Sequence, residues 1–104
     1  MRLSEARSRQ EYLVELYLGR NDQASLAASA ERTRLSAEEI SSAGTPVRYL
    51  RSIFVPEDET CFFLCEAESI DAVREVVQRA GLKFERVVEV APHDVRNNGE
   101  RRST

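Results

Sequence analysis

Ionisable side chains that could hold a ligand fall on three segments in which apolar residues alternate. The set consists of Glu15, Tyr17, Tyr49, Arg51 and Glu66. Two carboxylates beside a guanidinium can hold a hard cation or a polar small molecule. The same groups can equally form a structural ion pair where two subunits meet. The sequence leaves both interpretations open, and these side chains form the predicted ligand-binding set.

The cysteines do not add a disulfide or a recognisable metal site. Cys61 and Cys65 are four residues apart in a segment that is predicted to be extended. Four residues of strand span about 13 Å, whereas a disulfide needs Cα atoms within about 7 Å. We expect two buried thiols in a reduced compartment. The single histidine, His93, lies near the C-terminus, so no metal ligand set is assigned.

Motifs for catalysis are absent from the sequence. It contains no glycine-rich phosphate loop, HExxH, CxxC or nucleophile elbow. The neighbours Glu38 and Glu39 would point in different directions on a helix, which favours a solvated surface. The acidic run 57–59 is typical of a polar turn. No catalytic residue is assigned, and a role without catalysis is favoured.

Elements that position these residues follow in the order strand, helix, hairpin, helix, strand. The predicted ranges are 11–18, 23–42, 47–55 with 60–67, 69–80 and 83–90. This order is the split βαβ pattern of an α+β fold with a four-stranded antiparallel sheet. Connection rules place the first and third strands at its centre and both helices on one face. We expect residues 11–91 to form the domain, residues 1–10 a flexible extension and residues 92–104 a disordered tail.

Two helices can cover only one face of such a sheet. Alternation in the first strand directs Tyr12, Val14, Leu16 and Leu18 toward the helices and leaves Leu13, Glu15 and Tyr17 on the other face. The second strand is apolar on both sides and would add either Tyr49, Arg51 and Ile53 or Leu50, Ser52 and Phe54. The third strand would add Phe62, Leu64 and Glu66. Because the first and third strands are neighbours, we expect Glu15 and Glu66 to approach each other.

Such an apolar face would exceed the few hundred Å² that a monomer normally exposes. We therefore predict a homodimer with two-fold symmetry that packs sheet to sheet, as a dimeric α/β barrel, around a partly polar space.

Bulk properties narrow the class of partner. The chain has 104 residues, 41% of them hydrophobic, and a net charge of −3, which suits one small domain. No run approaches the roughly 18 apolar residues of a membrane helix, and the polar N-terminus does not resemble a signal peptide. A cytoplasmic location follows by default. The body of the chain is acidic, which argues against nucleic acid as a partner.

Several short segments resemble a known family. They are 47–52 (VRYLRS), 56–61 (PEDETC), 65–67 (CEA), 72–75 (AVRE) and 79–82 (RAGL). They resemble a bacterial, largely actinobacterial, family of small ferredoxin-like domains of unknown function that includes a nickel-responsive, nickel-binding protein. The resemblance implies a ferredoxin-like fold, a dimer and nickel as a ligand. Nickel-binding members tend to carry histidines where this chain has Arg51 and Val76, and a guanidinium cannot coordinate a cation.

We interpret the sequence as that of a noncatalytic, dimeric, ferredoxin-like protein that binds a metal ion or small ligand between its sheets. No cofactor is assigned. The first alternative is a cofactor-free dimeric α/β-barrel enzyme, monooxygenase- or isomerase-like, with its pocket between sheet and helices. The second is a plain interaction module.

Overall fold

The computed structural model describes residues 9–91 and confirms the predicted fold. Its elements are β1 (Gln10–Tyr17), α2 (Gln23–Ser42), β2 (Val47–Val55), the short 3-10 helix η1 (Pro56–Asp58), β3 (Thr60–Ala67), α3 (Ile70–Arg79) and β4 (Arg86–Val90). The four strands pair antiparallel in the order β2-β3-β1-β4, with β1 and β3 at the centre. This is the ferredoxin-like βαββαβ arrangement, and Gln10, predicted to precede the domain, begins its first strand.

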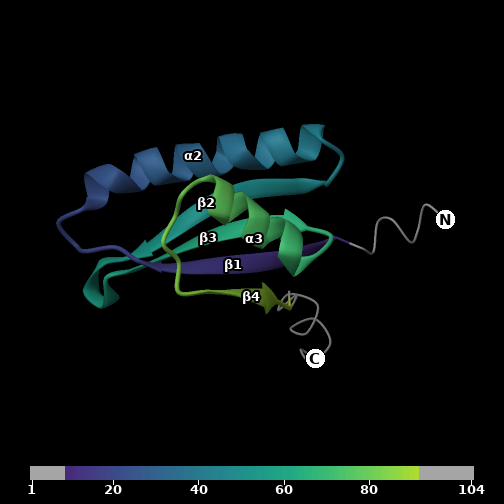
Figure 1. The fold of residues 1–104 in the computed structure, drawn as a ribbon. Coiled ribbons are helices and arrows are strands. Elements are labelled where there is room, and N and C mark those ends of the chain that lie inside the picture. The colour runs from purple at the N-terminus through teal and green to yellow at the C-terminus, as the bar shows by residue number, and fades with distance from the viewer. Residues whose placement is uncertain (1–8, 92–104) are drawn as a thin grey trace, which may run out of the picture.

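Both helices lie on the same face of the sheet, which makes a molecule of two layers (Figure 1). Helix α2 packs mainly on β2, and α3 packs on β3, β4 and α2. The core between the layers is apolar, and its fully buried side chains include Val14, Phe63, Val73, Val76 and Val77. The predicted inward set of β1, from Tyr12 to Leu18, is buried as expected from the alternation.

Helix α3 has clear start and stop signals. The Ser69 hydroxyl accepts a hydrogen bond from the Ala72 backbone N–H at 3.2 Å, which caps the N-terminus. Gly81 has φ of 75°, in the left-handed region that commonly ends a helix and that favours glycine. The apolar residues between them recur on one side, so a single face of α3 is buried.

Helix α2 is held less by its caps than by its position on the sheet. Asp22 occupies the N-cap position, as predicted, but its side chain makes no capping hydrogen bond. Its backbone carbonyl instead accepts hydrogen bonds from the backbone and hydroxyl of Ser25. The narrow buried face is formed by Thr33, Ser36, Ala37 and Ile40.

A β-bulge in β2 corrects both arrangements considered for that strand. The pairing of β2 with β3 shifts between Tyr49 and Arg51, so Leu50 is an extra residue without a cross-strand partner. Tyr49 pairs with the buried Cys65 and lies on the helix face, whereas Arg51 pairs with Leu64 and lies on the opposite face. One predicted set placed Tyr49 and Arg51 on the same face, and the other placed Leu50 on the same face as Ser52 and Phe54. Neither set is present.

Strand β4 begins at Arg86, three residues later than predicted. The preceding residues Leu82 and Phe84 pack against the core without joining the sheet ladder. The predicted terminal segments fall largely on residues 1–8 and 92–104, outside the described residues, and so does His93. Among the described helices, none combines the length and apolar character of a membrane span.

Candidate functional site

The sheet face that points away from the helices, called the open face here, carries the candidate site. Strand pairing aligns its side chains in rows across β2, β3, β1 and β4. In order, the rows are Arg48, Glu66, Glu11 and Val90; Arg51, Leu64, Leu13 and Val88; Ile53, Phe62, Glu15 and Arg86; and Val55, Thr60 and Tyr17.

The apolar residues of these rows form one diagonal band across the open face. The apolar band consists of Val90, Val88, Leu13, Leu64, Phe62, Ile53 and Val55. It runs from the C-terminal end of β4 to the C-terminal end of β2. Ile53 has 40% of its surface exposed, and Leu13, Phe62 and Val88 are partly exposed. The apolar surface expected on this face is present.

One polar corner of the open face lies beside the band on β2, β3 and the start of β1. This basic corner consists of Arg9, Arg48, Arg51, Glu11 and Glu66. The Glu66 carboxylate lies 3.3 Å from the Arg48 guanidinium and 3.7 Å from that of Arg9. Arg51 is exposed and makes no ion pair or side-chain hydrogen bond with any other residue in the range 9–91. Within the described residues, one cation on this face is therefore left without a counter-charge.

The opposite polar corner lies on β1, at the start of β4 and on the turn between β2 and β3. This acidic corner consists of Glu15, Tyr17, Asp58, Glu59, Glu85 and Arg86, which line a hollow of about 360 Å³ together with Leu16 and Thr60. The Arg86 guanidinium donates to the Glu15 carboxylate at 2.7 Å. The Tyr17 hydroxyl donates to Glu59 at 3.3 Å. The negative charge of Glu59 raises the pKa of Tyr17, because the phenolate would be repelled.

The structure divides the predicted ligand-binding set. Glu15, Tyr17, Arg51 and Glu66 lie on the open face, and Tyr49 does not. Glu15 and Glu66 share this face but pair with Phe62 and Glu11 respectively, so they stand about 13 Å apart along the strands. Their predicted approach is wrong for a single subunit.

Arg86 contacts Glu15, and Arg48 and Arg9 contact Glu66, whereas Arg51 contacts neither carboxylate. None of these arginines was in the predicted set, and the pairings of Arg86 and Arg48 depend on the register of an edge strand. The signal that could have found them is their alternation with apolar residues in segments 86–90 and 47–55.

Tyr49 lies instead on the helix face, at the edge of the core. Its ring meets that of Phe63 edge to face, with centroids 5.7 Å apart, and its hydroxyl is hydrogen-bonded to Ser52 at 2.5 Å. Beside it runs an open groove of about 760 Å³ between α2 and β2, lined by Arg34, Ala37, Glu38, Ser41, Ser42, Val47, Arg48, Tyr49 and Leu50. This groove lies between helix and sheet, where the alternative hypothesis of a cofactor-free enzyme predicted a pocket.

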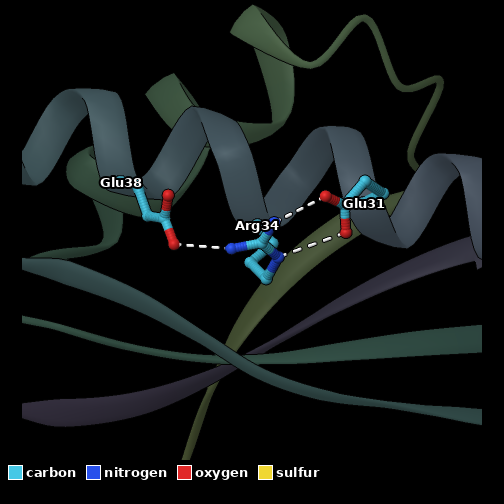
Figure 2. Close-up of polar contacts among 3 residues, drawn as sticks. All are labelled: Glu31, Arg34 and Glu38. Atoms are coloured by element: carbon cyan, nitrogen blue, oxygen red, sulfur yellow. Dashed lines mark hydrogen bonds and ion pairs between the residues drawn. The ribbon is translucent and has the colours of Figure 1, made fainter.

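The charges along this groove are largely matched within α2. Arg34 donates through Nε and Nη2 to both oxygens of Glu31 and through Nη1 to Glu38 at 2.6 Å (Figure 2). The hydrogen bond from Arg34 lowers the pKa of Glu31. Both carboxylates are more than half exposed, as expected for pairs spaced three and four residues apart on a helix surface. Glu38 is therefore an exposed surface residue that is paired with Arg34, and its surface position was predicted.

Both cysteines are buried on the helix face as free thiols. Burial raises the pKa of Cys61 to about 11 and that of Cys65 to about 12. Near neutral pH both therefore stay protonated, whereas the thiolate is the nucleophile and the metal ligand.

Comparison with protein families identifies the chain. A family model described as "Nickel responsive protein SCO4226-like" matches residues 12–90. The chain belongs to this family. No curated protein and no solved structure matches it. The match agrees with the resemblance of the hairpin and α3 segments, which predicted the same family.

The family description raises the question of whether these residues fit nickel. No group of three or more His, Cys, Asp or Glu side chains in the described part of the chain is placed to hold a metal ion. Of the two positions where the resemblance led us to expect histidine, Val76 is fully buried in the core and Arg51 carries a guanidinium. The described residues of one subunit therefore do not fit a nickel site.

Proposed function

We propose that this protein acts without catalysis as a homodimer, in which two open faces pack together and hold a small polar ligand beside the apolar bands. The apolar band between two charged corners, on a face that no described element covers, carries this proposal. Protein interfaces commonly have an apolar centre and a polar rim.

A second copy is the partner that fits best. Isologous contact joins the same patch on two subunits, and the open face already carries acidic and basic groups side by side. An apolar surface of this kind is removed from water when two sheets pack face to face, as in β-sandwiches. Because the charged residues stand beside the band, they would line the polar parts of the space between the sheets.

The ligand of this space is expected to be small, polar and at least partly anionic. Arg51 has no carboxylate partner within the described residues, and covering the face would remove water from its guanidinium. A charge that is withdrawn from water needs a counter-charge. Glu15, Tyr17 and Glu66 provide the hydrogen-bonding groups around it. The cytoplasmic location stays a prediction from the sequence.

Sedimentation combined with thermal unfolding tests the proposal. We expect a dimer at micromolar concentration and a rise in Tm with at least one member of a panel of carboxylates, phosphates and divalent cations, nickel included, because a ligand that binds only the folded state stabilises it. Arg51→Ala and Glu15→Gln should remove the rise, whereas Tyr49→Phe, on the other face, should keep it. A monomer at high concentration would refute the proposal.

An enzyme is the second candidate, because the groove beside Tyr49 lies between helix and sheet. It predicts the opposite pattern in the same experiment. Tyr49→Phe would then weaken the response to the ligand, and Arg51→Ala would leave it unchanged. A dimer that responds to no compound of the panel would instead favour a plain interaction module.

A further inference from the structure

We propose that the two-fold axis of the dimer runs along the apolar band, so that the basic corner of each subunit lies over the acidic corner of its partner. This inference rests on the proposed dimer and goes further, because it fixes which side chains meet. It follows from the placement of the charges relative to the band.

Two arrangements superpose one apolar band on another. The axis of a face-to-face dimer lies in the plane of the interface, and it runs either along the band or across it. An axis along the band exchanges the two sides of the band, so each corner meets the opposite corner. An axis across the band keeps the sides, so each corner meets its own copy. The apolar contact is similar in both cases, and the charges decide between them.

Arg51 and Glu15 are the groups that distinguish the two arrangements most sharply. Arg51 stands one strand beyond Leu64 on one side of the band, and Glu15 stands one strand beyond Phe62 on the other side. Each is therefore about 4.8 Å from its apolar neighbour's strand, in opposite directions. An axis along the band brings Arg51 over Glu15 of the partner subunit. An axis across the band brings Arg51 over a second Arg51.

The remaining charges favour the same choice. Glu66 belongs to the basic corner. With the axis along the band, Glu66 lies toward Arg86 in the acidic corner of the partner. Facing charges of opposite sign suppress wrong arrangements, and like charges placed opposite each other cost free energy. With the axis across the band, Glu15 would instead lie toward a second copy of itself.

A consequence is that the ligand site is shared between subunits. Arg51 and Glu66 of one subunit and Glu15, Tyr17 and Arg86 of its partner would enclose each polar space. Because Glu15 is already paired with Arg86, two guanidinium groups would share one carboxylate, which leaves positive charge for an anionic ligand. Symmetry makes two such spaces in a dimer, and neither is complete in a monomer. This sharing would also bring Glu15 and Glu66 together across the interface, although they are far apart within one chain.

Cysteine cross-linking tests the direction of the axis. The variants Arg51→Cys and Glu15→Cys are treated with a short bismaleimide, each alone and in an equal mixture. We expect the covalent dimer mainly in the mixture. The background from Cys61 and Cys65 is low, because both are buried and protonated. Arg74→Cys, on the exposed side of α3, is the matched control and should not cross-link in any combination.

The outcomes separate the failure of this inference from that of the dimer itself. A covalent dimer from Arg51→Cys alone, with no product between the two variants in the mixture, would place the axis across the band and overturn the inference. Monomeric wild-type protein in sedimentation would overturn the proposed function as well.

Arg51→Ala gives an independent answer if the cysteine variants do not associate. It should weaken the dimer by roughly 2- to 30-fold, the range for the loss of two exposed ion pairs. Tighter association would mean that two Arg51 side chains repel each other, and this too would overturn the inference.

Discussion

Replacing Ile53 by alanine tests whether the apolar band is an interface. Ile53 lies in the band and has 40% of its surface exposed, and Leu35 on α2 is its natural control with 44% exposed. Both are large aliphatic residues with similar exposed fractions. They differ in location, since Ile53 belongs to the open face and Leu35 to the helix layer.

The expected size of the effect follows from the exposed fraction. Full burial of an isoleucine side chain is worth about 1.5–3 kcal/mol. Because Ile53 keeps 40% of its surface exposed in the monomer, the dimer can gain about 0.6–1.2 kcal/mol from each copy. Two copies give about 1.2–2.4 kcal/mol, which is about 8- to 60-fold in Kd. Alanine retains the β-carbon, so we expect Ile53→Ala to raise Kd about tenfold.

Sedimentation velocity over a dilution series measures this change directly. We expect the midpoint of dissociation to move to about tenfold higher concentration for Ile53→Ala and to stay in place for Leu35→Ala. Urea unfolding of each variant checks that the monomer keeps its fold. An unchanged Kd for Ile53→Ala, or an equal shift for Leu35→Ala, would show that the band is not the contact surface.

Three further predictions concern the fold that supports this face. Phe63→Ala should lower the free energy of unfolding by about 3–5 kcal/mol, because the ring is fully buried against Tyr49; urea unfolding measures it, and a loss below 1 kcal/mol would contradict the packing. Ser69→Ala should cost about 1 kcal/mol in the same assay, through the lost cap of α3; an unchanged midpoint would contradict that role. The unfolding free energy should fall as pH rises above 9, because unfolded thiols ionise at a pKa of 9.0 while folding holds Cys61 at about 11 and Cys65 at about 12; Cys65→Ala should flatten this slope, and an identical slope would refute the cause.

The elements of the fold were predictable wherever burial is one-sided. In β1, the residues from Tyr12 to Leu18 alternate with residues that contribute to the open face, so the period alone identified a strand and its inner surface. In α3, Ser69 and Gly81 mark the two ends by cap chemistry that acts over a few residues. Such signals are local, and they do not depend on how distant segments pair.

Register was not predictable, because it depends on pairs of distant residues. Segment 47–55 has apolar residues on both sides, so its alternation looks nearly the same if the strand shifts by one residue. The bulge at Leu50 therefore cannot be recognised from the sequence. In the same way, the sequence placed Glu15 and Glu66 on neighbouring strands but could not set their offset. The ion pairs with Arg86 and Arg48 depend in the same way on how the edge strands β4 and β2 pair with their neighbours, and both were missed.

The bulge at Leu50 links the core of the molecule to its proposed interface. Strict alternation would place Tyr49 and Arg51 on the same face, so that either an aromatic ring would leave the core or a guanidinium would enter it. One unpaired residue resolves this conflict, because Tyr49 packs against Phe63 while Arg51 stands beside the apolar band on the open face. The position of Arg51 in the basic corner therefore results from a packing requirement on the opposite side of the sheet. If the dimer is arranged as proposed, the same inserted residue determines which side chain meets the acidic corner of the partner.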